Sequence, residues 1–248
     1  MKAIKMKSKK HDDKIINHET QESYRLNKYI SDSGVASRRE ADRLIEQGLV
    51  TINGIKAEIG QQVFKNDVVS VRGETIRREI KRVYIMLNKP RGITTTNDLE
   101  IKGNIRAFVN YPELIFPIGR LDKDSSGLIL LTNDGDIVNK ILRAEYGHEK
   151  EYVVTVDKTI DDNFIKELEK GVKIYNPVSK KYQVTEPAKI MQTNHNTFKI
   201  IIKQGLNRQI RRMTKALGYT VKSLRRIRII NLSLKDLEVG KWRYLTTY

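Results

Sequence analysis

The sequence predicts an α+β fold made of two folded units, a small one followed by a larger one. Its 248 residues suit one medium and one small domain, at about 150 residues per domain. A charged segment at residues 75–82 separates two stretches that differ in composition. In the second stretch, helical patterns interrupt the strand-like runs irregularly. That irregularity is typical of α+β proteins and not of a doubly wound parallel sheet.

The order of these stretches predicts four parts. Residues 1–23 are rich in charge and poor in apolar side chains, which predicts a mobile basic arm. Residues 24–72 form the small unit and residues 73–82 a linker. Residues 83–248 form the larger unit, which has the longer apolar runs and therefore the larger core.

Local signals predict two helices and a hairpin in the small unit. Ser37, followed three residues later by Glu40, predicts a capping box at the start of the second helix. Gly48 is the expected stop of that helix. Asn53-Gly54 between alternating apolar residues is a strong signal for a tight β-hairpin.

Apolar patterns in the larger unit predict buried strands and amphipathic helices. The predicted strands lie at residues 83–87, 129–131, 152–156 and 198–202. The predicted helices lie at residues 137–142, 164–168 and 210–217. Asn88 to Gly92 reads as a loop, because it combines Asn, Pro and Gly directly after a strand.

The strongest global signal is the charge. Lys and Arg number 47 against 30 Asp and Glu, a formal net charge of +17. Such an excess favours a polyanionic partner, most simply a nucleic acid. The sequence has no apolar run of about 20 residues that could span a bilayer, and its N-terminus lacks an apolar signal core. We therefore expect a cytoplasmic protein with no membrane partner.

Composition and motifs also exclude several kinds of chemistry. The chain has no cysteine, which removes disulfides, thiolate catalysis and cysteine-ligated metals. It also lacks a glycine-rich phosphate loop. Asp122 to Gly127 copies the opening of a calcium-binding loop, but Asn133 stands where a bidentate Glu is needed. No metal site is predicted.

Asp122 is a candidate reactive group for another reason. It lies between Arg120 and Lys123, and a carboxylate beside cations stays ionised and available as a nucleophile or base. By spacing alone, an ordinary turn aspartate is the more common explanation.

Residues 25–57, RLNKYISDSGVASRREADRLIEQGLVTINGIKA, resemble the S4 RNA-binding domain. In that family the paired helices and the hairpin present a basic surface to structured RNA. The resemblance implies that Lys28, Arg38, Arg39 and Lys56 contact phosphates. Arg38 and Arg39 at a helix N-terminus oppose the helix dipole, which also favours an anion nearby.

Residues 119–128, GRLDKDSSGL, resemble the signature of the RluA/RsuA pseudouridine synthase superfamily. Five further segments match the family and occur along the chain in the family's order: LNKPRG, FPIGRLD, LTNDGD, HEKEYVVTV and QGLNRQIRRM. The resemblance spans about residues 83–243. The wordings GRLDKDSSGL, NKILRA, HEKEY and KQGLNRQIRRM are most similar to the RluF-type synthases of 23S ribosomal RNA. A catalytic domain with a mostly antiparallel central sheet and flanking helices is implied, as is uridine isomerisation without a cofactor.

The resemblance also implies roles for single residues. Asp122 would act at C1′ of the target uridine or take its C2′ proton. Tyr152 would stack on the uracil, and Arg211 would pair with Asp122 and keep it charged. Arg120 would occupy the space that the flipped nucleotide leaves.

The charge distribution supports an RNA-binding surface near this site. Residues 203–228 contain nine cations and no carboxylate, which suits a wall that binds phosphates. Within it, Asn207, Arg208, Arg212 and Lys215 are the expected contacts. The expected partner is structured RNA, namely 23S rRNA, its assembly intermediates or a tRNA, from which the uridine must be extruded. We expect the protein to be a monomer.

Two other classes of protein remain open from composition. A non-catalytic RNA-binding ribosome-assembly factor would carry the same charge, but would not need Asp122, Tyr152 and Arg211 together. A glycoside hydrolase shares carboxylate chemistry at an anomeric carbon and needs a second carboxylate, for which Asp124 or Asp134 could serve. The surrounding cations favour a polyanion over a neutral sugar.

Overall fold

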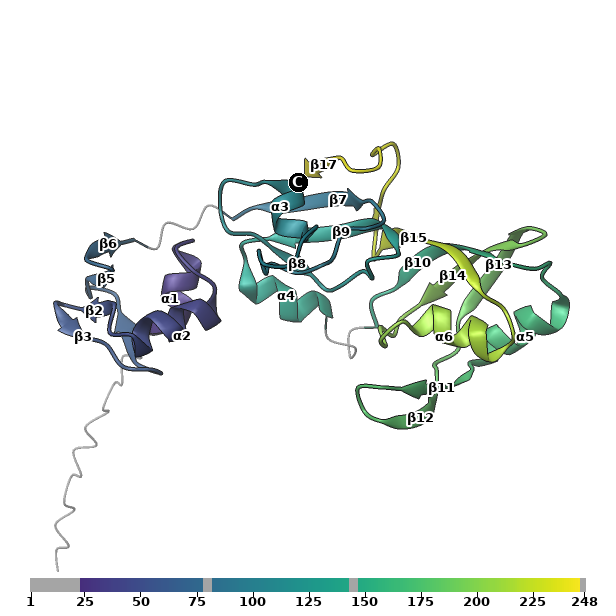
Figure 1. Ribbon diagram of the computed structural model, residues 1–248, viewed down its shortest axis with the longest axis horizontal. Helices are drawn as coiled ribbons and strands as arrows, with labels where there is room; N and C mark the ends of the chain where they lie inside the picture. The colour runs from purple at the N-terminus through teal and green to yellow at the C-terminus, as the bar shows by residue number, and fades with distance from the viewer. Residues whose placement is uncertain (1–22, 78–81, 143–146, 246–248) are drawn as a thin grey trace, which may run out of the picture.

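A computed structural model describes residues 23–77, 82–142 and 147–245 of the chain. Figure 1 shows a small unit near the N-terminus and a larger unit that holds the rest of the described chain. The predicted mobile arm lies outside the described residues except for Ser23, which begins the first strand. Within the described ranges, no helix is long and apolar enough to cross a membrane.

The small unit consists of two helices packed against short strands. Its helices are α1 (Leu26–Asp32) and α2 (Arg38–Glu46). Its strands are β1 (Ser23–Arg25), β2 (Val50–Ile52), β3 (Ile55–Lys56), β4 (Gln62–Phe64), β5 (Val69–Val71) and β6 (Glu74–Ile76). β3, β2, β5 and β6 form one antiparallel sheet, and β1 pairs with β4. One apolar cluster, which includes Leu26, Leu44 and Val50, holds the helices on the strands.

Two details of the small unit differ from expectation. Ser37 caps α2 by accepting the Glu40 amide at 3.3 Å, but the Glu40 carboxylate pairs with Arg43 at 3.2 Å instead of returning to Ser37. An exposed side chain can choose the cation one turn further along the helix, so only half of the capping box forms. Residues 74–76, placed by sequence in the linker, form β6 because they complete the edge of the sheet beside β5.

The predicted hairpin is confirmed. Asn53 and Gly54 both have positive φ, at +53° and +80°. Positive φ at both central residues is the requirement of the two-residue turn whose twist matches that of the strands. β2 and β3 consequently pair with Ile52 opposite Ile55.

The larger unit is built on one extended sheet. Its strands are β7 (Tyr84–Lys89), β8 (Phe116–Ile118), β9 (Ser126–Thr132), β10 (Lys150–Val156), β11 (Lys173–Asn176), β12 (Lys181–Val184), β13 (Lys189–Asn194), β14 (Thr197–Ile202), β15 (Val221–Ile229), β16 (Leu232–Ser233) and β17 (Trp242–Tyr244). Its helices are α3 (Ile105–Val109), α4 (Gly135–Leu142), α5 (Asp162–Lys170) and α6 (Gln209–Ala216). The strand order is β13-β14-β10-β15-β9-β7-β17, with β8 beside β9 and β16 beside β15, while β11 and β12 form a separate hairpin.

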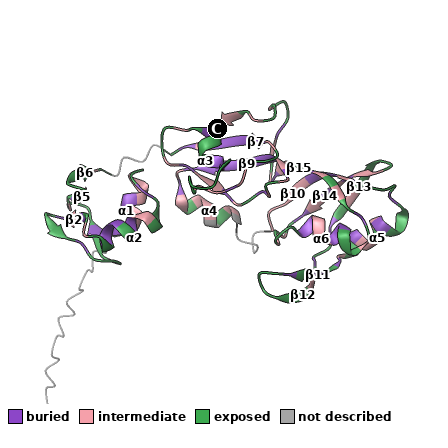
Figure 2. Ribbon diagram, in the orientation of Figure 1, coloured by how far each residue is buried: buried purple, intermediate pink, exposed green. Residues whose placement is uncertain are grey.

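The expected α+β class and mostly antiparallel sheet are confirmed. Among the described strands, only β9 and β15 pair in parallel. α3, α5 and α6 pack on one face through a cluster that includes Ile105, Phe164 and Ile210. α4 covers the other face, where it packs against a cluster that includes Leu128 and Leu130 of β9. Figure 2 shows β7 and β9 as buried strands and the β11–β12 hairpin as exposed.

The loop expected at Asn88 to Gly92 begins two residues later than the sequence suggests. Asn88 and Lys89 belong to β7, and both are 0% exposed. Their side-chain nitrogens find backbone partners: Nδ2 of Asn88 donates to the Leu237 carbonyl at 2.7 Å, and Lys89 Nζ donates to the Pro90 and Ile93 carbonyls at 3.0 and 2.8 Å. Because these bonds are made inside the protein, the strand continues up to Pro90.

Candidate active site

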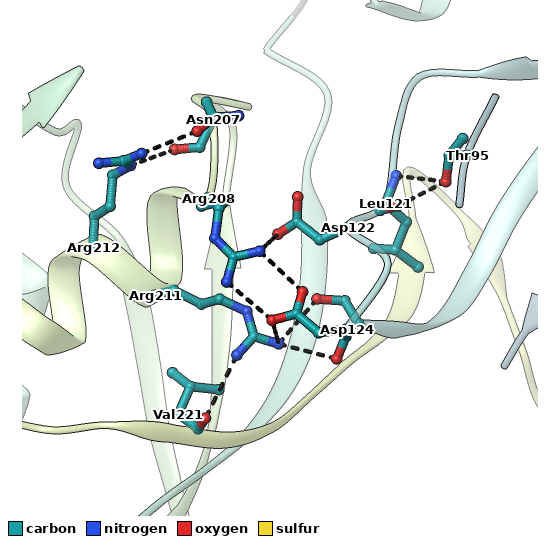
Figure 3. Close-up of polar contacts among 10 residues, drawn as sticks. Thr95, Leu121, Asp122, Asp124, Asn207, Arg208, Arg211, Arg212 and Val221 are labelled. Atoms are coloured by element: carbon teal, nitrogen blue, oxygen red, sulfur yellow. Dashed lines mark hydrogen bonds and ion pairs between the residues drawn. The ribbon is translucent and has the colours of Figure 1, made fainter. Parts of the chain in front are cut away.

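Asp122 lies in the loop between β8 and β9, one residue beyond an anchored position. The Thr95 hydroxyl donates to the Leu121 carbonyl at 2.7 Å and lies 3.3 Å from the Leu121 amide (Figure 3). Leu121 itself is buried, and the Ser125 amide closes a turn by donating to the Asp122 carbonyl at 3.0 Å. These contacts hold the backbone of Asp122 in place, while its side chain stays 31% exposed.

Arg208 approaches this loop from the start of α6. It occupies the N-cap position with φ of +50°. Its Nη1 and Nη2 donate to the two carboxylate oxygens of Asp124 at 3.0 and 2.9 Å, and Nη1 lies 3.6 Å from Oδ2 of Asp122 (Figure 3). The hydrogen bonds from Arg208 hold the pKa of the Asp124 carboxyl below its ordinary value. One guanidinium therefore serves two carboxylates.

Arg211 does not make the pair that the family resemblance implies. Its Nη2 lies 3.3 Å from Oδ2 of Asp124 and donates to the Asp124 carbonyl at 3.1 Å and to the Ser125 hydroxyl at 3.3 Å. The ion pair of Asp122 is with Arg208 instead. The reason is position on α6: Arg211 lies one turn further into the helix, with its side chain 13% exposed and beneath the loop. Burial lowers the pKa of Arg211, although Asp124 opposes that shift.

Asp122 and Tyr152 share one cavity of about 590 Å³. Tyr152 comes from β10, an interior strand of the sheet between β14 and β15, and is 8% exposed. Lys150, Arg208 and Arg226 contribute cations to the same cavity. The structure thus brings together two of the three predicted catalytic residues directly, and Arg211 through Asp124.

Two cations at this site were not singled out by sequence. Burial lowers the pKa of Lys89 to about 8, while the nearby carboxylates of Asp122 and Asp124 act in the opposite direction. Arg226 lies in β15 with its guanidinium 6.0 Å from the centre of the Tyr152 ring. Lys89 could have been assigned to the site from its place in the family motif LNKPRG. Arg226 could not, because it is one of nine cations at residues 203–228 and nothing in the local sequence distinguishes it.

The expected RNA contacts in the larger unit lie around the cavity and on α6. Arg120 lines the cavity and is exposed. Arg212 donates to the carbonyl of Asn207 at 2.9 Å and to its side-chain oxygen at 3.1 Å, so the two form a single polar unit (Figure 3). Lys215 is exposed near the end of α6.

In the small unit, three of the four expected contacts are exposed. Arg38 and Arg39 begin α2, and Lys56 lies in β3. Lys28 differs, because its ammonium group pairs with Asp32 at 2.9 Å and with Asp136 of α4 at 3.1 Å. Lys28 therefore links the small unit to the larger one.

Comparison with known proteins identifies the class to which this arrangement belongs. The family described as RNA pseudouridylate synthase matches residues 83–216, and the S4 domain matches residues 25–69. The chain belongs to the RNA pseudouridylate synthase family and carries an S4 domain in front of the synthase domain.

Individual relatives indicate which members of this family the chain is similar to in sequence and in structure. The dual-specificity RNA pseudouridine synthase RluF of Escherichia coli K12 is 55% identical over 226 residues, which cover 90% of this chain and 76% of that protein. The ribosomal large subunit pseudouridine synthase B of Bacillus subtilis is 38% identical over 229 residues, covering 90% and 93%. A crystal structure of a pseudouridylate synthase matches with a TM-score of 0.65 and 31% identity, covering 90% of this chain and 96% of that one.

The expectation of an RluF-like synthase with an S4 domain is therefore confirmed. The protein is an isomerase that acts on RNA. Neither a non-catalytic assembly factor nor a glycoside hydrolase fits this membership.

Proposed function

We propose that this protein isomerises a specific uridine of 23S ribosomal RNA to pseudouridine, with Asp122 as the reactive group. The observation that carries the proposal is the shared cavity of Asp122 and Tyr152, in which the Asp122 carboxylate lies 3.6 Å from the Arg208 guanidinium. The name of the Bacillus relative, a ribosomal large subunit pseudouridine synthase, supports the choice of RNA. The words "dual-specificity" in the name of the Escherichia relative support a second RNA substrate, for which we propose a tRNA.

The position of Asp122 in a cavity supports a mechanism in which the uridine leaves its stack. A base inside a helix cannot reach a carboxylate in a cavity whose wall includes a buried tyrosine. In the proposal, the flipped uracil stacks on Tyr152, and Asp122 either bonds to C1′ or takes the C2′ proton. The N1–C1′ bond breaks, uracil turns, and a C5–C1′ bond forms as the Asp122–C1′ bond breaks or as the proton returns to C2′. The proton then leaves C5 and N1 gains one, so the overall change is an isomerisation.

Cations around the cavity suit the phosphates that flank the flipped nucleotide. Arg120, exposed at the cavity, would fill the place of the extruded base, and Lys215 and the Arg212–Asn207 unit would hold the backbone. The S4 domain would bind phosphates in a second part of the RNA through Arg38, Arg39 and Lys56. The proposal places the protein in the cytoplasm as a monomer.

Mapping pseudouridine across total RNA from cells with and without the protein tests this assignment. We expect one 23S site to disappear and to return with the wild-type protein but not with Asp122→Asn. In single-turnover assays, Asp122→Asn should slow the reaction at least about 1,000-fold, within the range for positioned acid–base groups. RNA affinity should stay near wild type, because one carboxylate among many cations is removed.

Asp162→Asn is the matched control, since Asp162 is an exposed carboxylate in the first turn of α5 and lines no part of the cavity. Cells that carry Asp162→Asn should regain the lost pseudouridine in 23S rRNA. Residual turnover of Asp122→Asn within tenfold of wild type would show that the reactive group is another residue.

A further inference from the structure

Arg226 is a buried cation that the proposed chemistry leaves without a task. It stands opposite Tyr152 in the β10–β15 register and is 4% exposed. Nε donates to the Leu128 carbonyl at 2.7 Å, and Nη1 donates to the Arg120 carbonyl at 3.4 Å. Nη2 is buried and has no hydrogen-bond partner within the described residues. An unmet buried donor is rare and costly, which indicates that a ligand completes it.

The fold brings Arg226 to this place through a close backbone approach. Gly127 of β9 pairs in parallel with Arg226 of β15. A Cβ at Gly127 would lie 2.1 Å from the Arg226 carbonyl oxygen, and the glycine has φ of +108°. Only glycine permits this spacing, so the guanidinium is held from both strands before any ligand arrives.

The surroundings select the chemistry of the ligand. Tyr152, Leu121 and Leu224 supply apolar cavity walls, and the Arg226 guanidinium lies 6.0 Å from the Tyr152 ring centre. The charge of Arg226 is felt nearby: burial lowers the pKa of Lys150, and Arg226 lowers it further. A flat group with apolar faces and an acceptor oxygen on its edge fits these features. A phosphate fits poorly, because it is joined to the RNA chain on both sides and Arg226 is almost fully covered.

We propose that Nη2 of Arg226 donates to a carbonyl oxygen of the target uracil and that the guanidinium stabilises the uracil anion formed during the reaction. This inference rests on the proposed function. When the N1–C1′ bond breaks, its electron pair leaves with uracil and spreads from N1 to the adjacent carbonyl oxygen. The uracil is an anion whether Asp122 bonds to C1′ or removes the C2′ proton. A cation fixed in a sheltered cavity stabilises that charge without reorganisation.

The test compares two leaving groups in the full-length protein. The substrates are fragments of 23S rRNA that carry uridine or 5-fluorouridine at the mapped position, and single-turnover loss of that nucleoside is followed by digestion and mass spectrometry. Arg226→Gln should slow the uridine reaction about 100-fold, as for removal of one donor to a developing anion. Fluorine withdraws electrons from the ring and stabilises the anion. Arg226→Gln should therefore slow the 5-fluorouridine reaction by a clearly smaller factor than the uridine reaction.

Arg106→Gln is the matched control, because Arg106 is an exposed arginine of α3 that lines no part of the cavity. It should keep the wild-type rate with both substrates when the enzyme is saturating. Equal slowing of both substrates by Arg226→Gln would indicate a purely structural role and overturn the inference, as would a wild-type rate.

If Arg226→Gln fails to fold, Arg226→Lys carries the same comparison, since it keeps the charge while losing the forked hydrogen bonds. It too should slow uridine more than 5-fluorouridine. A wild-type protein that converts neither substrate would contradict the proposed function itself, and that result is distinct from a failure confined to Arg226.

Discussion

Arg208 holds Asp124 through a two-pronged ion pair, with donor–acceptor distances of 3.0 and 2.9 Å. The same guanidinium reaches within 3.6 Å of Asp122, the proposed reactive carboxylate, so a single cation lies beside both aspartates. Asp124 thus fixes the cation that lies beside the Asp122 carboxylate.

Arg208→Lys tests this dependence. Lysine keeps the charge but cannot bind both oxygens of Asp124 at once. We expect the single-turnover rate to fall about tenfold, equivalent to ~1.4 kcal/mol of barrier. Arg243→Lys, which alters a half-buried arginine paired with Asp236 at 3.3 Å, should leave the rate unchanged. A wild-type rate for Arg208→Lys would show that charge alone suffices.

Gly127→Ala should strongly destabilise the synthase domain. The new Cβ would meet the Arg226 backbone at 2.1 Å, and alanine strains at φ of +108°. We expect a loss of about 3 kcal/mol from overpacking and backbone strain, measured by urea unfolding. Gly135→Ala is the control at the start of α4, where the nearest atom to a Cβ is 3.9 Å away. It should be neutral or stabilising by about 0.5 kcal/mol. A small effect at Gly127 would mean that β9 and β15 can move apart.

Lys89 should give stability an unusual dependence on pH. Its pKa falls from 10.5 to about 8 in the folded protein, so between these values the unfolded chain binds more protons. Stability should therefore rise as the pH increases from about 8 to 10.5, and the burden of the buried charge should be fully present below pH 8. Subtracting the unfolding free energy of Lys89→Met from that of wild type at each pH isolates this contribution. A flat difference over that interval would contradict the lowered pKa.

The S4 domain should contribute to RNA affinity through electrostatic contacts with phosphates. Arg38 and Arg39 are exposed at the start of α2, and neither forms an ion pair within the described chain. Replacing both with alanine should weaken RNA binding and reduce the slope of log affinity against log salt by about one to two units. Arg43→Ala removes a cation that already pairs with Glu40 at 3.2 Å, so its slope should change less. Equal slopes for the double variant and wild type would show that these two arginines do not touch phosphate.

Local sequence patterns were sufficient for most described helices of the protein but for a smaller share of its strands, and β15 was not among the predicted ones. Asn53-Gly54 needs only its own two residues to set the hairpin, and Ser37 caps α2 from three residues away. The five ordered motifs of the larger unit were likewise enough to indicate the family, which the relatives confirm. These features depend on residue type and short spacing, and both can be read directly from the chain.

Only the tertiary structure decided which charged groups meet. Arg208 and Arg211 are three residues apart in one motif, yet the turn of α6 brings Arg208 to Asp122 and places Arg211 under Asp124. Lys89 looked like part of a loop until burial in β7 gave its ammonium two backbone partners. Arg226 stood among nine similar cations until the parallel pairing with Gly127 placed it beside Tyr152. Register between distant strands sets such contacts, and register depends on the packing of the whole sheet and leaves no mark in a local pattern.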